Sequence, residues 1–166
     1  MLYLVFSDSH GDVSQASWII EQFKDRANGV IHLGDHADDF HKLQQKYQDK
    51  YGMAFLNVRG NCDLASPDPD LRTFTVEKRK VLLVHGHQQH VSYGTAELKM
   101  LARQNSANVV LFGHTHIPFL SEEEGLLILN PGSISSPRGG SRAGFALLEL
   151  ENGKAAAILN RYEDFS

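Results

Sequence analysis

The stretch Leu2-Tyr3-Leu4-Val5-Phe6-Ser7-Asp8-Ser9-His10 carries the pattern that decides the fold. Its apolar run, Leu2–Phe6, is followed almost at once by a carboxylate and an imidazole two positions apart. An apolar run of this length is typical of a buried β-strand. Side chains two positions apart on an extended segment point to the same side, so Asp8 and His10 can reach one small volume. The stretch therefore predicts a buried strand that ends in a pair of potential metal ligands.

Further apolar runs of similar length recur along the chain, each bounded by Gly, Asp, Asn or a polar cluster, and each is predicted as a strand. They are Val30–Leu33, Met53–Val58, Val81–Val84, Val109–Phe112, Leu126–Leu129, Phe145–Leu150 and Ala155–Leu159. Apolar residues at helical spacing predict helices over 16–27 and 40–51, and a third that starts with Thr95 as N-cap. This alternation predicts an α/β fold with right-handed crossovers onto a parallel sheet.

The end of the chain has a different pattern. From Leu126 onward no helix is predicted, and the last three strands are joined by turns that contain glycine. We expect these strands to pair as antiparallel neighbours or to form a second sheet face. The charge run Glu122–Glu124, just before them, is predicted to be a solvated turn.

Length and composition indicate one globular domain over residues 1–166. A chain of 166 residues with 42% hydrophobic and 22% charged residues can bury a core without disulfides. The net charge of −4 argues against nonspecific binding to nucleic acid or anionic lipid. No stretch approaches the ~20 apolar residues needed to cross a bilayer. The single cysteine, Cys62, fits a reducing compartment, so we expect a cytoplasmic protein.

Potential metal ligands follow each of the first five apolar runs. In an open α/β sheet the loops after the carboxyl ends of parallel strands line one edge, so these side chains should converge. Glycine precedes three of the ligands, at Gly34, Gly60 and Gly113, where a sharp exit from the strand favours a residue without Cβ. The candidate ligands are Asp8, His10, Asp35, Asn61, His85, His114 and His116.

The chemistry of this set favours a catalytic metal site that binds an anion. Nitrogen and oxygen ligands without thiolate suit Mn²⁺, Fe, Zn²⁺ or Ni²⁺ better than a structural zinc site. Asp8 and Asp35 supply about −2 against about +4 from two divalent ions, which leaves a positive pocket for an anion such as phosphate. The remaining histidines have plainer interpretations. His32 is predicted as a core or rim residue, and His36, His41 and His90 as exposed or supporting residues.

The order of these motifs resembles a known family. Asp8-x-His10, Gly34-Asp35, Gly60-Asn61-Cys62-Asp63, His85-Gly86-His87 and Gly113-His114-x-His116 resemble the motifs of the calcineurin-like metallophosphoesterases. Asn130-Pro131-Gly132-Ser133, followed by Ser136-Pro137-Arg138, resembles the YfcE-like phosphodiesterase subgroup. The resemblance spans residues 1 to about 140. It implies a four-layer αββα sandwich, in which two mixed sheets stack with helices outside.

The resemblance also implies roles for individual residues. One metal ion would be held by Asp8, His10, Asp35 and His116, and the other by Asp35, Asn61, His85 and His114, with Asp35 as the bridge. Asp35, Asn61 and His114 are the expected catalytic residues, and Arg59, His87 and Arg138 are candidate phosphate contacts. A hydroxide shared by two ions, Mn²⁺ or else Zn²⁺, Fe or Ni²⁺, would attack the phosphorus of a small phosphate ester in line with the leaving oxygen. A homodimer or homotetramer is implied as well.

One position departs from the wider family. Many relatives have His after the Gly-Asn pair, whereas this chain has Cys62, as the YfcE-like subgroup does. A histidine there can protonate the leaving group, so its replacement favours phosphodiesters or reactive esters as substrates.

Two other functions compete with this one. The first is a non-catalytic protein-interaction scaffold on the same fold, as in the retromer subunit that resembles these enzymes. The complete ligand set, including His10, weighs against it. The second is another zinc hydrolase built on His114-x-His116. A metallo-β-lactamase-type site would need Asp-His shortly afterwards, and Ile117-Pro118-Phe119 offers neither residue.

Overall fold

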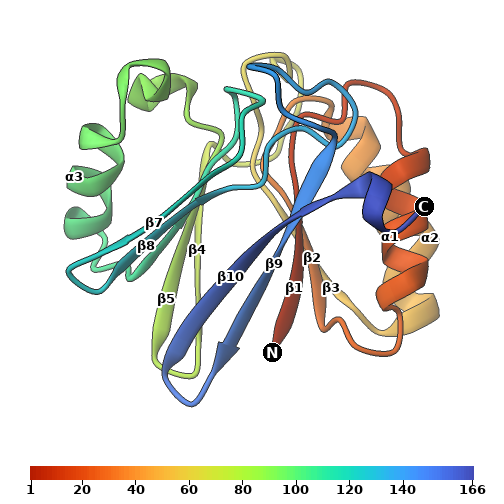
Figure 1. Ribbon diagram of the computed structural model, residues 1–166, viewed down its shortest axis with the longest axis horizontal. Coiled ribbons are helices and arrows are strands. Elements are labelled where there is room, and N and C mark those ends of the chain that lie inside the picture. The colour runs from red at the N-terminus through yellow and green to blue at the C-terminus, as the bar shows by residue number, and fades with distance from the viewer.

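A computed structural model, which describes residues 1–166, contains two five-stranded sheets stacked face to face with helices on the outside (Figure 1). The first sheet has the order β10-β9-β1-β2-β3. Its strands are β1 (Leu2–Phe6), β2 (Gly29–His32), β3 (Ala54–Asn57), β9 (Gly144–Glu151) and β10 (Lys154–Arg161). Strands β1, β2 and β3 are parallel, because helices α1 (Ser14–Phe23) and α2 (Ala37–Tyr51) form the crossovers. Strand β9 pairs antiparallel with both β1 and β10.

The second sheet has the order β4-β5-β6-β8-β7. Its strands are β4 (Leu71–Val76), β5 (Arg79–Val84), β6 (Val109–Leu111), β7 (Phe119–Glu123) and β8 (Leu126–Asn130). Helix α3 (Ala96–Gln104) connects β5 to the parallel strand β6, and β8 continues the parallel arrangement. Both edges of this sheet, β4 and β7, are antiparallel. Three short 3₁₀ helices, η1 (His87–Gln89), η2 (Val91–Tyr93) and η3 (Tyr162–Asp164), complete the structure.

The alternation of side chains along each strand creates three separate apolar layers. Val5 and Ile31 of the first sheet pack against residues of the second sheet such as Leu111. Their neighbours on the strand face the other way, so Phe6 packs with α1 and α2. A smaller cluster joins α3 to the outer face of the second sheet, with Leu98 fully buried. Helix, sheet, sheet and helix therefore form four layers, which confirms the predicted αββα sandwich.

The eight predicted strands and three predicted helices are all present, although their ends differ by a few residues. The expected pairing of the last three strands was wrong in part. Strand β8 belongs to the second sheet, where it runs parallel to β6, and only β9 and β10 pair with each other. The prediction of a turn over Glu122–Glu124 was also wrong in part. Glu122 and Glu123 lie in β7, and only Glu124 lies in the turn.

The topology brings the loops after β1, β2 and β3 of the first sheet to the same end of the sandwich as those after β5 and β6 of the second (Figure 1). Every predicted metal ligand lies in one of these five loops. None of the helices is long and apolar enough to cross a membrane.

Candidate metal centre

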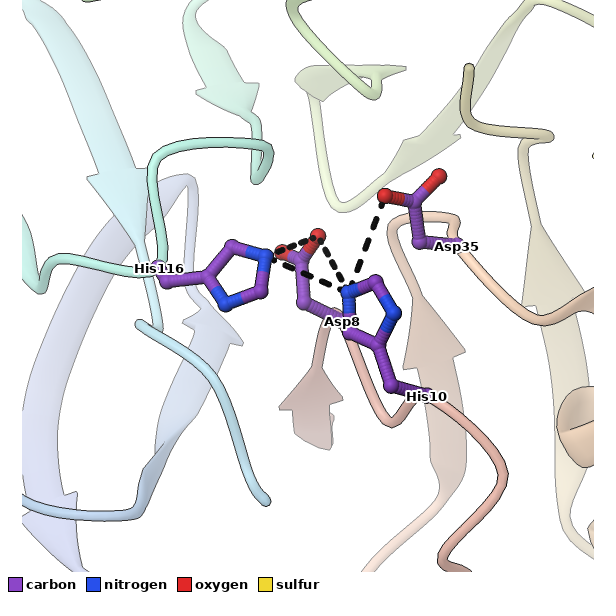
Figure 2. A group of neighbouring side chains, drawn as sticks. All are labelled: Asp8, His10, Asp35 and His116. Atoms are coloured by element: carbon purple, nitrogen blue, oxygen red, sulfur yellow. Dashed lines mark hydrogen bonds and ion pairs between the residues drawn. The ribbon is translucent and has the colours of Figure 1, made fainter. Parts of the chain in front are cut away.

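Four side chains from three loops form a compact group at the junction of the two sheets (Figure 2). Asp8 and His10 follow β1, Asp35 follows β2 and His116 follows β6. One ligand atom from each residue lies within 4.8 Å of the others. The Nε2 atoms of His10 and His116 are 3.2 Å apart, and both face the carboxylate of Asp8. The group combines two carboxylates with two imidazoles, which is a donor set that suits a divalent cation.

The two carboxylate oxygens of Asp8 have different surroundings. Oδ2 accepts hydrogen bonds from the Ser7 hydroxyl at 2.6 Å and from the backbone N–H of His114 at 3.1 Å. Oδ1 is buried and has no hydrogen-bond partner, although it lies 3.3 Å from Nε2 of His116. An unpaired buried carboxylate oxygen is costly unless it binds a cation. The geometry of Asp8 therefore fits a metal ion on the Oδ1 side.

The surroundings of Asp8 favour its charged form despite its burial. Burial on its own would raise the pKa of this carboxyl group. The neighbouring imidazoles of His10 and His116, the charge of His85 and the hydrogen bond from Ser7 outweigh that effect and hold the pKa well below its usual range. The site thus keeps the negative charge that binding a divalent ion requires.

Hydrogen bonds to backbone carbonyls orient two of the histidines. Nδ1 of His116 lies 2.6 Å from the carbonyl oxygen of Ser136, and Nδ1 of His85 lies 2.7 Å from that of Leu33. In both rings the Nδ1–H can donate to the carbonyl, which leaves the lone pair of Nε2 directed into the site. This is the usual arrangement of a histidine that binds a metal through Nε2.

A second group of ligand atoms lies beside the first. Oδ1 of Asn61 is 3.0 Å from Nε2 of His85 and 3.1 Å from Nδ1 of His114. Oδ2 of Asp35 is 3.4 Å from the same atom of His85 and 3.8 Å from Nε2 of His10. The carboxylate of Asp35 therefore faces both groups of ligands. Burial would raise its pKa, but the interactions with His85 lower it to about 2.

The backbone around the site is strained. Five of the seven predicted ligands have a positive φ in the left-handed region, which costs a non-glycine residue of order 1–3 kcal/mol. They are Asp8 (54°), His10 (47°), Asp35 (62°), His114 (70°) and His116 (61°). Strain that recurs at the ligands of one site is typical of a functional centre, where geometry has been kept at the expense of stability.

The glycines beside the ligands are required for two different reasons. Gly34 has a φ of 102°, a conformation that side chains with Cβ rarely adopt. At Gly60 a Cβ would overlap the carboxylate of Asp35, and at Gly113 it would overlap the hydroxyl of Ser7. The prediction that these positions need a residue without Cβ is confirmed, but at two of them the reason is space.

Asp63 holds two of the loops together, a role that the sequence analysis did not assign. Its Oδ2 accepts hydrogen bonds from the backbone N–H groups of Asp35 at 2.9 Å and Gly60 at 2.8 Å. Its Oδ1 accepts from those of His36 at 2.8 Å and Ala37 at 2.9 Å, at the start of α2. The only sequence signal was its place at the end of the Gly60–Asp63 motif, where nothing identified it as buried.

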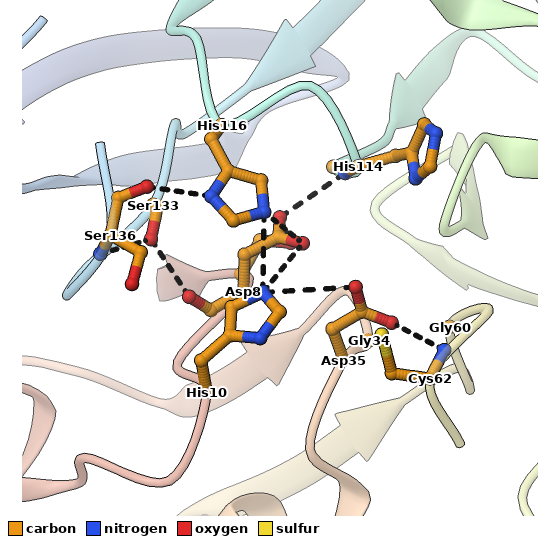
Figure 3. A network of polar contacts seen from close by, with 12 residues as sticks. Asp8, His10, Gly34, Asp35, Gly60, Cys62, His114, His116, Ser133 and Ser136 are labelled. Atoms are coloured by element: carbon orange, nitrogen blue, oxygen red, sulfur yellow. Dashed lines mark hydrogen bonds and ion pairs between the residues drawn. The ribbon is translucent and has the colours of Figure 1, made fainter. Parts of the chain in front are cut away.

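The segment after β8 supports the site from the other side. The hydroxyl of Ser133 donates to the backbone carbonyl of Asp8 at 2.7 Å, and Figure 3 shows this bond next to that between His116 and Ser136. Asn130 donates to the carbonyl of Gly113 at 3.0 Å. The motif Asn130–Arg138 thus fixes the loops that carry Asp8 and His116.

The three predicted phosphate contacts have different positions. The guanidinium of Arg59 is held by Asp70, with nitrogen–oxygen distances of 2.6 and 3.2 Å. The ring of His87 lies 5.4 Å from that of His85, and its Nδ1 is buried without a partner. Arg138 is exposed, and its backbone N–H donates to the carbonyl of His116 at 3.1 Å. His87 and Arg138 therefore border the site, whereas Arg59 is engaged by a carboxylate.

The other histidines match their predictions. His32 is buried and hydrogen-bonded to Ser9 through Nε2 at 2.8 Å, which makes it a core residue. His36 is exposed, and its ring lies 5.2 Å from that of His10. His41 pairs with Asp68, and the exposed His90 pairs with Glu97.

Cys62 is exposed beside the site. Its backbone N–H donates to Oδ1 of Asp35 at 3.0 Å (Figure 3). Burial of part of the side chain and the negative charge of Asp35 raise the pKa of the thiol. It therefore stays protonated at neutral pH.

Comparison with known proteins identifies relatives along most of the chain. Residues 1–153 match the model of the calcineurin-like phosphoesterase superfamily domain. The chain is 33% identical over 156 residues to the probable metallophosphoesterase YsnB of Bacillus subtilis, covering 93% of this chain and 88% of YsnB. It is 30% identical over 172 residues to the phosphodiesterase YfcE of Escherichia coli K12, covering 90% and 88%. Vps29 of Entamoeba histolytica, solved in complex with Zn²⁺, has a similar fold, with a TM-score of 0.76, 23% identity and coverage of 95% and 90%.

Proposed function

Because the chain belongs to the calcineurin-like phosphoesterase superfamily, we propose that it is a phosphodiesterase that uses two divalent metal ions to hydrolyse small phosphate esters. One observation carries the proposal. The carboxylate of Asp35 faces two adjacent groups of candidate ligands. The buried Oδ1 of Asp8, which has no hydrogen-bond partner within the protein, is consistent with this. Asp8, His10, Asp35 and His116 would hold one ion. Asp35, Asn61, His85 and His114 would hold the other.

The bound ions would neutralise charge on the phosphate and lower the pKa of the attacking water. The contribution of the protein is to fix the ligands. The carbonyls of Leu33 and Ser136 keep His85 and His116 in the tautomer that presents Nε2. Asp63 fixes the backbone of Asp35, so that Oδ2 stays turned toward both groups. His87, whose ring borders the second group, is placed to contact a phosphate oxygen.

Diesters are the substrates we propose, with Mn²⁺ as the first metal to test. The relative YfcE is named a phosphodiesterase and supports this choice. A protonated thiol at Cys62 is a weaker proton donor near neutral pH than an imidazolium would be, and this disfavours esters with basic leaving groups.

The alternative of a non-catalytic scaffold has support from the fold, which the chain shares with Vps29. Fold alone does not establish catalysis. The alternative leaves the strained backbone of five ligands and the unpaired oxygen of Asp8 without a purpose. We therefore favour the enzyme.

The test is hydrolysis of bis-p-nitrophenyl phosphate by the purified protein. We expect EDTA to abolish the reaction and added Mn²⁺ to restore it. His116→Ala should lower the rate by at least about a hundredfold, whereas His90→Ala, a change at an exposed histidine outside the site, should leave it within twofold. Absence of hydrolysis with Mn²⁺, Zn²⁺, Fe²⁺ and Ni²⁺ in turn would favour the scaffold.

A further inference from the structure

A groove of about 370 Å³ opens between the start of α2 and the loop after β3, next to the metal centre. His36, Asp38 and His41 line the side formed by α2. Cys62, Ala65 and Pro67 are among the residues on the opposite side. The volume lies within the range of small-molecule binding sites, ~300–1,000 Å³.

Two contacts connect this groove to the metal centre. The backbone of Cys62 donates to Oδ1 of Asp35, whose other oxygen faces both groups of metal ligands. The ring of His36 meets that of His10 edge-on at 5.2 Å. Cys62 and His36 therefore lie between the groove and the candidate metal ligands, and an ester group of a diester with its phosphate at the metal ions would pass these two residues to enter the groove.

The charges along the groove disfavour an anionic ester group. No Lys or Arg lines it, and Asp38 exposes a carboxylate there. The N-terminus of α2 offers little attraction to an anion, because Asp63 already accepts hydrogen bonds from the N–H groups of His36 and Ala37. A second phosphate or a carboxylate would meet repulsion, so the groove selects an uncharged group.

The other residues that line the groove suit a flat aromatic ring attached to a sugar with free hydroxyl groups. The imidazole of His41 is held in place by Asp68, 2.9 Å from its Nε2, and Pro67 and Ala65 lie among the other lining residues. Nucleobases stack on aromatic side chains, His included, in proteins that bind nucleic acids. The carboxylate of Asp38 can accept hydrogen bonds from sugar hydroxyls.

We propose that this groove binds the nucleoside group of a phosphodiester substrate. The proposal rests on the proposed function, since the metal ions must hold the phosphate. It adds the substrate class, a nucleotide diester with one uncharged nucleoside beside α2.

The experiment measures binding to the manganese-loaded protein by calorimetry, with adenosine monophosphate, ribose 5-phosphate and inorganic phosphate. We expect adenosine monophosphate to bind at least about tenfold more tightly than the other two. Ala65→Trp, which fills the groove, should remove that advantage and leave inorganic phosphate within twofold. The matched control Ala96→Trp, at the exposed first residue of α3, should change neither affinity.

A second variant covers the case in which Trp at position 65 also weakens phosphate binding. His41→Ala removes the ring and lies away from the metal ligands. It should weaken the binding of adenosine monophosphate about fivefold or more and leave the affinity for ribose 5-phosphate unchanged. Equal affinity of the wild-type protein for all three ligands would overturn the proposal. So would an effect of His41→Ala that is the same for all three.

These results are separable from those for catalysis. If the protein prefers adenosine monophosphate but hydrolyses no diester, the nucleoside groove is supported and the proposed reaction is contradicted. If it hydrolyses diesters without this preference, only the nucleoside groove is contradicted.

Discussion

Oδ2 of Asp35 and Nε2 of His85 approach within 3.4 Å, although one residue follows a strand of the first sheet and the other a strand of the second. The contact lies where the two groups of metal ligands meet. Ions bound there would link loops of both sheets, so metal binding and the stability of the sandwich should be coupled.

Asp35→Asn should therefore weaken the binding of both metal ions, because it removes a negative charge shared by the two groups of ligands. His116→Ala should weaken the binding of only one ion. Titration with Mn²⁺ followed by elemental analysis should give two ions per chain for the wild type and one for His116→Ala. Two tightly bound ions in Asp35→Asn would contradict the assignment of Asp35 as the bridge.

Metal removal should also lower the melting temperature. A ligand that binds only the folded state, at one hundred times its Kd, stabilises the protein by ~2.7 kcal/mol. We expect EDTA to lower the melting temperature of the wild type and to have little effect on Asp35→Asn. A melting temperature that is the same with and without EDTA in the wild type would show that the ions do not couple the sheets.

Asp63→Ala should be destabilising out of proportion to its size. The change leaves four backbone N–H groups without their acceptor, and each hydrogen bond to a charged group is worth ~1.5–3 kcal/mol. We expect the free energy of unfolding of the metal-free protein to fall by about 3 kcal/mol or more. Asp49→Ala, a change at an exposed carboxylate of α2, should stay within ~0.5 kcal/mol. Similar losses in the two variants would show that Asp63 does not anchor the loops.

Metal affinity should decrease as the pH is lowered. In the metal-free protein, the adjacent carboxylate of Asp8 raises the pKa of His116 above its ordinary value. A metal ion needs the neutral imidazole, so protons compete with it up to a higher pH than at an unperturbed histidine, ~6.5. The Kd for Mn²⁺, measured by calorimetry across pH, should be constant at alkaline pH and begin to rise before the pH reaches ~6.5. A Kd independent of pH down to mildly acidic values would contradict this.

The sequence predicted every strand except β4 and β7, the two edges of the second sheet, and the reason is physical. Strands such as β1, β2 and β6 are covered on both faces and therefore appear as continuous apolar runs. The edge strands β4 and β7 are only partly covered, so polar residues interrupt them. Glu122 and Glu123 of β7 are exposed, which is why this segment was interpreted as a turn. Nothing in the apolar runs themselves assigns β8 to one sheet and β9 to the other.

The candidate ligands could be selected from the sequence because their chemistry is local, close behind each apolar run, and the structure brings them together. Their supports could not be selected in this way, because a partner such as Asp63 or Ser133 acts on backbone groups that are distant in the sequence. The pairing of Arg59 with Asp70 was missed for a related reason, since a spacing of eleven residues across a loop gives no signal.

Cys62 follows the candidate ligand Asn61 directly, and its backbone N–H donates to the carboxylate of Asp35. The raised pKa of its thiol makes it a weak proton donor, whereas an imidazolium can protonate a leaving oxygen near neutral pH. General-acid assistance is typically worth ~10²–10⁴-fold and helps basic leaving groups most.

Cys62→His should therefore raise the rate of hydrolysis of alkyl esters by at least about tenfold, and that of nitrophenyl esters much less. Cys62→Ser should hydrolyse bis-p-nitrophenyl phosphate at a rate within about twofold of the wild type, because the thiol is proposed neither as a ligand nor as a nucleophile. The measurement is the slope of log rate against the pKa of the leaving group for all three proteins. The slope should become shallower only in Cys62→His, because only imidazole offsets poor leaving ability. An unchanged slope would place this side chain away from the leaving oxygen, and a collapse of Cys62→Ser on the nitrophenyl diester would give the thiol a direct chemical role.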